Sequence, residues 1–154
     1  MRISIASDHG GFEQKEQLKA FLAREGHEVC DRGPASEGPV DYPDFAALVA
    51  RDVAQESAER GVLVCGTGIG MAIAANKVAG ARAASVATPE FAGLCREHND
   101  ANILCLSGRF VDLAANEAIL GVFLHTEFSG GRHARRVQKI AALESAEQAK
   151  PSGE

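Results

Sequence analysis

Apolar residues along the chain form short runs that alternate with stretches of helical spacing. Apolar or small residues dominate positions 2–7, 62–65, 82–87 and 102–106, and each run has the length of one buried strand. Between these runs, apolar residues recur every three or four positions, which is typical of amphipathic helices. The pattern predicts strands and helices in alternation along the whole chain.

A further short strand is expected at 28–31, followed by a loop over 32–40 that is rich in glycine and proline. The predicted helices cover residues 12–25, 41–60, 71–78, 89–98, 112–124 and 133–148. Strands that alternate with helices in this way form parallel βαβ units, with helices on both faces of one sheet. We therefore expect an α/β three-layer sandwich of about five parallel strands. A single domain is expected over 1–149, with 150–154 as a frayed tail.

The composition is that of an ordinary globular domain. The chain has 154 residues, of which 45% are hydrophobic and 24% are charged, and this mixture excludes disordered and collagen-like classes. No apolar run approaches the roughly 18 residues of a membrane helix, and the apolar part of residues 1–7 is too short for a signal peptide. We therefore expect a cytoplasmic protein that does not bind membranes.

The four cysteines show no spacing that is typical of a zinc site, so we expect reduced thiols and no metal. Cys30, Cys95 and Cys105 lie in apolar runs and are expected in the core. The net charge of −5 makes the chain as a whole a poor binder of polyanions. A basic cluster is found only near the C-terminus, at Arg132, His133, Arg135, Arg136 and Lys139. Because this patch is short and aromatic residues are few, nucleic-acid binding is not expected.

Ligands of parallel sheets bind beyond the carboxyl ends of the strands. Three segments of this chain follow a predicted strand and carry polar or glycine residues: Asp8–His9, Cys65–Gly70 and Ser107–Arg109. Because the carboxyl ends of parallel strands meet at one edge of the sheet, we expect these three segments to share one site.

The segment after Cys65 has glycine at every second position, which leaves backbone N–H groups free to converge on an anion. A dinucleotide fingerprint needs glycine or alanine where Met71 stands, and a cysteine phosphatase needs arginine at the same position. A Walker loop needs Gly-Lys-Ser/Thr, which is absent. What remains is a loop that binds a phosphate or an oxyanion, with the Cys65 thiol at its opening. The alternative is that Cys65 merely ends a buried strand, since free cysteine is often buried.

Five separated motifs, in order, resemble the ribose/galactose sugar-phosphate isomerase family. They are Ser7-Asp8-His9-Gly10-Gly11-Phe12, Asp41-Tyr42-Pro43, Cys65 to Gly70 leading to Ala74-Ala75-Asn76-Lys77, Arg96 to Asn102, and Gly130-Gly131-Arg132-His133-x-x-Arg136-Val137. The resemblance extends over residues 2 to 144 and is greatest to ribose-5-phosphate isomerases B. It implies a Rossmann-like fold, an aldose–ketose isomerase without metal or cofactor, and at least a homodimer with active sites at the interface.

The resemblance also implies roles for single residues. Cys65 would be the base that moves a proton between C2 and C1, and Thr67 would assist proton transfer between the two substrate oxygens. His98, with Asp8 nearby, would open the sugar ring. The loop backbone that would hold the enediolate consists of Gly66, Gly68, Ile69 and Gly70. The phosphate ligands would be His9, Arg109, Arg132 and Arg136, and the sugar contacts would be Tyr42 and Asn99. A subgroup with a glutamate base is not resembled, because residues 69–74 contain no carboxylate.

These residue types suit the chemistry of an aldose–ketose isomerisation. Removing a proton next to a carbonyl produces an enediolate, and preorganised N–H donors stabilise its charge. Histidine exchanges protons near neutral pH, as ring opening requires. Two arginines four positions apart lie on one helical face, and their planar forks suit a phosphate. Three alternatives remain: an isomerase of galactose 6-phosphate or allose 6-phosphate, a non-catalytic subunit that binds phosphosugars, and a thiol-dependent phosphatase, against which Met71 argues.

Overall fold

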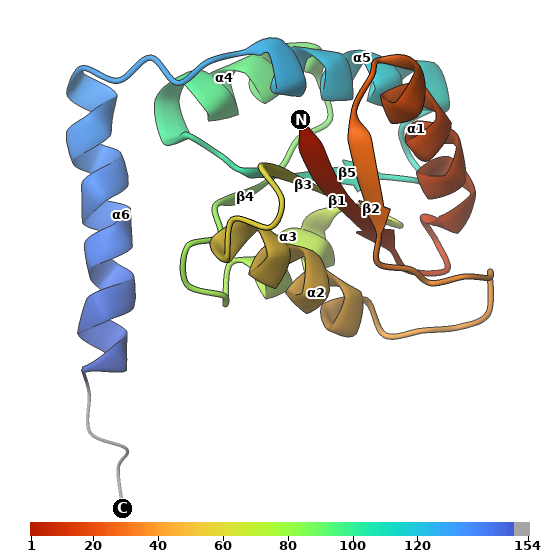
Figure 1. The fold of residues 1–154 in the computed structure, drawn as a ribbon, viewed down its shortest axis with the longest axis horizontal. Coiled ribbons are helices and arrows are strands. Elements are labelled where there is room, and N and C mark those ends of the chain that lie inside the picture. Colours follow the sequence, from red (N-terminus) through yellow and green to blue (C-terminus); the bar gives the residue numbers. More distant parts are fainter. Residues whose placement is uncertain (150–154) are drawn as a thin grey trace, which may run out of the picture.

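Strands and helices alternate in the predicted order, and all paired strands of the sheet are parallel (Figure 1). The computed structural model describes residues 1–149, so the predicted tail at 150–154 lies outside the described residues. Within 1–149 the strands are β1 (Arg2–Ser7), β2 (Glu28–Asp31), β3 (Arg60–Cys65), β4 (Ala83–Ser85) and β5 (Ile103–Ser107). The helices of the same part are α1 (Phe12–Arg24), α2 (Tyr42–Ala54), α3 (Ile69–Ala75), α4 (Pro89–Asn99), α5 (Leu113–His125) and α6 (Arg132–Gln148).

The sheet has the order β2-β1-β3-β5-β4, so β1, β3 and β5 occupy its centre. Helices α1, α4 and α5 cover one face, and α2 and α3 cover the other (Figure 1). Side chains of β3 alternate between the two cores: Val62 and Val64 pack on the first face, Leu63 and Cys65 on the second. The predicted three-layer α/β/α sandwich with five parallel strands is thereby confirmed.

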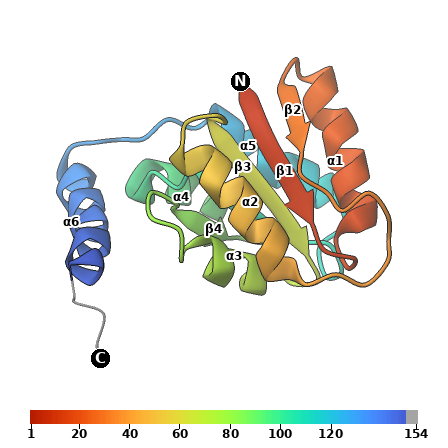
Figure 2. The same ribbon diagram turned by 60° about the horizontal axis from the view of Figure 1, so that its bottom comes forward.

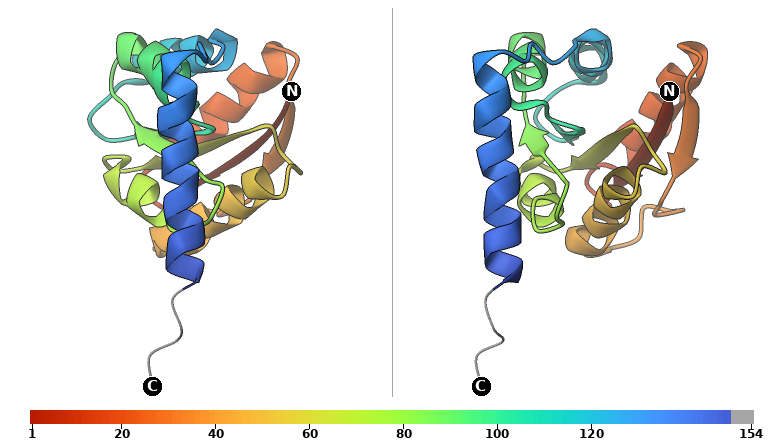
Figure 3. Two further views of the ribbon diagram at one scale, coloured as in Figure 1. Left: turned by 90° about the vertical axis from the view of Figure 1, so that its left-hand side faces the viewer. Right: turned by 60° about the vertical axis from the view of Figure 1, so that its left-hand side comes forward.

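Helix α6 stands outside these layers, beyond the β4 edge of the sheet (Figure 2). Two further views show it upright beside α4 and β4 (Figure 3). None of its residues, all of which the structure describes, is buried. Its apolar side chains Ile140 and Leu143 are 42% and 66% exposed. The Glu144 carboxylate accepts the Gly80 N–H at 3.0 Å, which holds the middle of α6 against the body.

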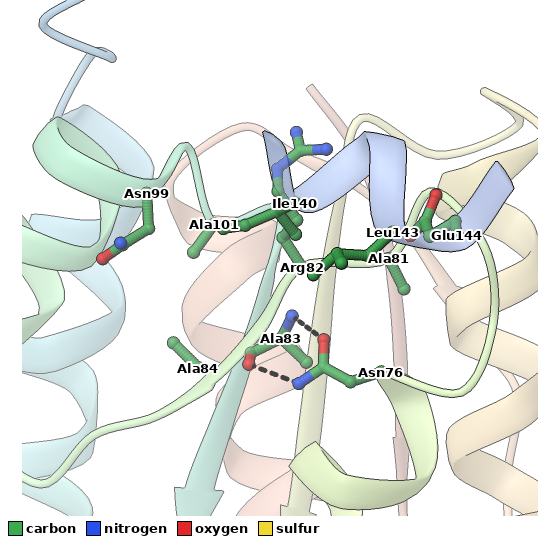
Figure 4. A pocket seen from close by; sticks show the side chains of 10 residues that line it. All are labelled: Asn76, Ala81, Arg82, Ala83, Ala84, Asn99, Ala101, Ile140, Leu143 and Glu144. Atoms are coloured by element: carbon green, nitrogen blue, oxygen red, sulfur yellow. Dashed lines mark hydrogen bonds between the residues drawn. The ribbon is translucent and has the colours of Figure 1, made fainter. Parts of the chain in front are cut away.

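The helix predicted at 41–60 ends at Ala54 in the structure, and residue 60 already belongs to β3. Two further predicted boundaries differ near α3. The helix predicted at 71–78 instead covers 69–75, because Gly68 adopts a left-handed conformation (φ 80°) that turns the chain directly from β3 into α3. The strand predicted at 82–87 covers only 83–85. Beyond it, the chain turns into α4, whose first turn is capped by the Thr88 hydroxyl. On the outer side of β4, the Asn76 amide takes the place of a neighbouring strand and bonds both the N–H and the carbonyl of Ala83, at 2.8 and 2.9 Å (Figure 4).

The cysteines predicted in the core divide into two groups. Cys95 and Cys105 are buried, as predicted, and burial raises the pKa of Cys95 to about 11 and also raises that of Cys105. The prediction for Cys30 is wrong: its side chain is exposed because β2 is an edge strand with only β1 beside it.

Gly11 marks a very close approach of two backbone segments, the turn after β1 and the end of β3. A Cβ at this position would lie 2.3 Å from the carbonyl oxygen of Val64, the residue before Cys65. Because this oxygen belongs to the central strand, Gly11→Ala is expected to lower the free energy of unfolding by about 3 kcal/mol in chemical denaturation. The matched control is Gly121→Ala in α5, where the added Cβ would meet no atom of the described residues within 4 Å. It should raise stability by up to about 1 kcal/mol. Similar stabilities of both variants would contradict the prediction.

Candidate active site

The carboxyl ends of β1, β3 and β5 meet in the middle of the sheet. Cys65 pairs with Ser107 in the parallel register, and the Asp8 N–H donates to the Val64 carbonyl at 3.1 Å. The Gly108 N–H donates to the Cys65 carbonyl at 2.8 Å, and the Arg109 N–H donates to that of Gly66 at 3.2 Å. The structure therefore brings together the three segments that the topology predicted to share one site.

Cys65 lies inside the turn that its own glycine segment makes. Its side chain is 5% exposed, and its Sγ accepts the Gly68 N–H at 3.1 Å. Gly68 is required here because its φ is 80° and a Cβ would lie 3.0 Å from the Leu106 backbone. Thr67 is exposed beside it, and its Oγ1 accepts the Ile69 N–H at 3.2 Å. The Cys65 side chain thus packs in the core on the α2–α3 face, while its sulfur also bonds one backbone N–H at the end of the strand, and a threonine hydroxyl is part of the same turn.

Tyr42 comes from α2 and reaches the glycine segment at Gly70. A Cβ on Gly70 would lie 2.8 Å from the tyrosine ring, so only glycine admits the ring at this distance. The Tyr42 side chain is 40% exposed. It therefore forms part of the surface of this edge.

The Arg109 guanidinium lies against two glycines that belong to different segments. Hypothetical Cβ atoms on Gly10 and Gly66 would each lie 3.3 Å from guanidinium atoms. Arg109 is exposed. Its positive charge is therefore carried directly beside the turn that holds Cys65.

Asp8 and His9 form the first of the three segments. The Asp8 carboxylate is 8% exposed, and its Oδ1 accepts the Gly11 N–H at 3.0 Å. His9 is exposed, and its Nδ1 accepts the Val40 N–H at 3.4 Å. His9 and Gly10 also line a polar hollow of about 350 Å³ at this edge.

The other predicted site residues lie at the opposite end of the sheet, where the strands begin, which we call the amino edge. His98 and Asn99 end α4, which returns antiparallel to the strands, and Ile103 then begins β5. Asp8 and Cys65 lie at the far ends of their strands, and five residues of β5 extend over about 13 Å at 3.3 Å per residue. Within one chain Asp8 and His98 therefore lie apart, and the expectation that they meet in a site at a subunit interface stays a prediction.

His98 has instead a partner from the start of α6. Its ring stacks on that of His133, with centroids 4.4 Å apart and planes inclined by 14°. Arg132 and Arg136 lie close to this pair: burial and the neighbouring positive charges of His98, Arg132 and Arg136 lower the pKa of His133. The amino edge therefore carries a second cluster of imidazole and guanidinium groups.

Two residues of this second cluster were missed by reasoning from the sequence. His133 stands inside the Gly130–Val137 motif, but the spacing did not indicate that its ring would meet that of His98. Arg96 stands inside the Arg96–Asn102 motif, but its position did not indicate that its guanidinium is buried. In both cases, the sequence feature that could have pointed to the residue was the motif that contains it.

Asn99 lines a hollow of about 470 Å³ between α6 and β4, together with Ile140 and Leu143 (Figure 4). This hollow is mostly apolar and does not include Cys65. Among residues 1–149, no three or more histidine, cysteine or acidic side chains are grouped as ligands of a metal ion. In the same part of the chain, no helix is long and apolar enough to span a membrane.

Comparison with known proteins identifies the family. A model of the Ribose/Galactose Isomerase family matches residues 3–140. The probable ribose-5-phosphate isomerase B of Mycoplasma pneumoniae is 46% identical over 143 residues, covering 92% of this chain and 94% of that protein. The ribose-5-phosphate isomerase B structure of Clostridium thermocellum superposes with a TM-score of 0.94 at 48% identity, over 96% of this chain and 99% of that one. That of Mycoplasma genitalium, solved with bound ribulose-5-phosphate, has a TM-score of 0.91 at 46% identity and covers 94% and 96%. The chain belongs to the ribose/galactose isomerase family.

Proposed function

We propose that this chain is an aldose–ketose isomerase that interconverts D-ribose 5-phosphate and D-ribulose 5-phosphate. The observation that carries the proposal is the Cys65 sulfur, which accepts the Gly68 N–H at 3.1 Å at the carboxyl edge of the central strands. A thiol in this position suits a base that works next to amide donors. The relative of known structure that holds ribulose-5-phosphate supports the choice of a pentose phosphate.

The reaction on the open-chain aldose needs one base and one proton carrier. The Cys65 thiolate takes the proton from C2, the electron pair forms the C1–C2 double bond, and the carbonyl oxygen at C1 becomes an oxyanion. Amide donors of the loop at Gly66, Gly68, Ile69 and Gly70 stabilise this charge, and the N–H groups of Gly68 and Ile69 exchange their bonds to Cys65 Sγ and Thr67 Oγ1 for bonds to the oxyanion. One such donor typically contributes 10²–10³ in rate. Thr67 passes the O2 proton to O1. The Cys65 thiol then returns its proton to C1, which leaves the carbonyl at C2.

We propose that a complete site needs two copies of the chain. Cys65, Asp8 and Arg109 lie at the carboxyl edge, whereas His98 and Arg136 lie at the amino edge of the same sheet. A symmetric homodimer would place the amino edge of one copy against the carboxyl edge of the other, and would do so twice. In such a site His98 of one copy opens the ring next to Asp8 of the other.

The exposed apolar side chains support such an assembly. Near the carboxyl edge, Ile69 is 57% exposed, Ile73 is 60% exposed and Phe110 is 79% exposed. At the other edge, Ile140 and Leu143 of α6 are also exposed. Apolar side chains gathered on two surfaces are typical of interfaces between subunits. The phosphate ligands would then be His9 and Arg109 of one copy with Arg132 and Arg136 of the other, and Tyr42 and Asn99 would contact the sugar.

Two variants that are each defective at low substrate concentration should restore activity to one another when mixed. Cys65→Ala removes the base, and Arg136→Ala removes a phosphate ligand and should mainly raise KM for phosphorylated sugars. After the two are unfolded together and refolded, each mixed dimer has one site that contains both intact residues. At a concentration of ribose 5-phosphate far below the KM of Arg136→Ala, we expect the mixture to regain turnover that neither variant shows alone. Mixing Cys65→Ala with a second base variant, Cys65→Ser, is the control and should regain none. Absence of complementation in dimers shown to exchange subunits would contradict the shared site.

The substrate is tested with a panel of pentose and hexose phosphates, including galactose 6-phosphate and allose 6-phosphate, in the presence of a chelator. We expect the highest kcat/KM with ribose 5-phosphate. Higher activity on a hexose phosphate would make this chain an isomerase of the related sugar, and activity that is lost with chelator would contradict a metal-free mechanism.

We also propose that the protein works in the cytoplasm. The proposal is supported by the four cysteines, which all lie in the described residues and form no disulfide.

A further inference from the structure

Arg96 is a buried arginine at the amino edge of the sheet. It belongs to α4, is 2% exposed, and has its guanidinium 5.8 Å from the centre of the Phe123 ring. Its Nη1 donates to the Asp100 carboxylate at 2.8 Å and to the Ala101 carbonyl at 2.6 Å, and its Nε donates to the Thr126 carbonyl at 3.1 Å. Burying a charge is costly unless it is paired and hydrogen-bonded. The carboxylate of Asp100 provides the opposite charge, and the two carbonyls accept the other hydrogen bonds.

The contacts of Arg96 join two segments that are far apart in the sequence. Asp100 caps α4 in a left-handed conformation (φ 47°), directly after His98 and Asn99. Asp100 is also bonded by Arg82, whose Nη2 lies 3.2 Å from the second carboxylate oxygen. Aspartate is among the few non-glycine residues that tolerate this conformation. Arg96 and Arg82 each bond one oxygen of its carboxylate, but only Arg96 also bonds the second segment.

The second segment is the connection from α5 to α6. Thr126 is its first residue, and the Ser129 N–H further along donates to the Glu97 carbonyl at 3.2 Å. The connection then leads to Arg132 and His133, whose ring stacks on that of His98. Because α6 buries none of its own residues, all of which are described, and Glu144 bonds Gly80 well beyond the first turn, the position of that first turn depends mainly on this connection.

We propose that Arg96 is a positioning residue, which fixes His98 and the start of α6 relative to each other. This inference rests on the proposed function, in which His98 opens the sugar ring and Arg132 and Arg136 bind the phosphate. One planar guanidinium reaches the cap of α4 on one side and the α5–α6 connection on the other. A lysine cannot make both contacts in fixed geometry, because its ammonium has no planar fork.

The test compares Arg96→Gln with the matched control Arg82→Gln. Both variants lose an arginine that bonds Asp100, but only Arg96 also bonds Thr126. We expect Arg96→Gln to lower kcat/KM for ribose 5-phosphate by about 10²-fold, the scale of a displacement of about 1 Å in a catalytic group. Arg82→Gln should stay close to the parent enzyme.

A second measurement is independent of activity. In NMR spectra, the stacked rings of His98 and His133 shift each other's ring protons upfield, and these signals are assigned with His98→Gln and His133→Gln. Arg96→Gln should lose the upfield shift while the backbone amide spectrum of the sheet is retained. If Arg96→Gln fails to fold, Asp100→Asn removes the charge that Arg96 bonds and keeps a residue that tolerates the left-handed conformation. We expect the same loss of the ring shift in this variant.

Retention of the ring shift in both Arg96→Gln and Asp100→Asn would overturn the proposal, whatever the activity. Loss of the ring shift with unchanged kcat/KM would overturn it as well, together with the role of His98. A parent enzyme that does not convert ribose 5-phosphate would contradict the proposed function alone, because the spectra would still report whether Arg96 holds the two segments.

Discussion

Cys65→Ala is expected to lower kcat for ribose 5-phosphate by about 10³-fold, the usual contribution of a positioned base. The Sγ that accepts the Gly68 N–H is the atom that the substitution removes. The variant should still bind ribose 5-phosphate in calorimetry, because the proposed phosphate ligands remain. In deuterated water, the parent enzyme should incorporate deuterium at C2 of the aldose and C1 of the ketose, and the variant should lose this exchange to the same extent as turnover.

The matched control is Cys30→Ala. This thiol is exposed on the edge strand β2, away from the carboxyl end of β3, and its removal should leave kcat unchanged. Wild-type turnover in Cys65→Ala would contradict the mechanism and would favour a non-catalytic role for the thiol. Deuterium exchange that persists while turnover is lost would mean that a different group removes the C2 proton.

His98→Gln is expected to change how the rate depends on enzyme concentration. Ribose 5-phosphate is mostly cyclic in water, and only its open form can lose the C2 proton. Without a group that opens the ring, the rate with ribose 5-phosphate should level off at high enzyme concentration, because uncatalysed ring opening becomes limiting. Ribulose 5-phosphate cannot close a ring on C2, since its C5 oxygen is esterified. Its conversion by the variant should therefore stay proportional to enzyme concentration.

The control for this experiment is His125→Gln, in which an exposed histidine whose Nδ1 lies 2.8 Å from the Gly121 carbonyl is replaced. Its rate should remain proportional to enzyme concentration in both directions, as in the parent enzyme. If the rate of His98→Gln with ribose 5-phosphate also rises in proportion over the whole range, another group opens the ring. His133, which stacks on His98, is then the first residue to replace.

The elements of the fold were predicted from the sequence almost completely. The run Val62–Cys65 between Gly61 and Gly66 is apolar throughout, as a strand buried on both faces must be, and the structure buries it in two cores. The ends of an element were predicted less accurately where a side chain, and not a neighbouring strand, bonds its backbone. Asn76 bonds the outer side of β4, and no local pattern indicates a contact of this kind.

The carboxyl-edge half of the site could also be predicted, because parallel strands bring their ends together whatever their order in the sheet. That Cys65, Asp8 and Arg109 are neighbours follows from this rule. His98 and Arg136 were assigned by resemblance to the same site, but within one chain they lie at the other edge. The helix α4 must return to begin β5, so its last residues are carried away from the thiol.

The sequence alone determined which segments become strands and helices and that the glycine segment follows a strand with a cysteine at its end. These properties depend on residues within a few positions of each other, whose apolar period and turn preferences are local. Only the tertiary structure decided that Cys30 is exposed, that α6 lies outside the layers, and that Arg96 is buried against Thr126. Each of these depends on contacts between residues about 30 or more positions apart, or on their absence, and such contacts exist only once the sheet has its order.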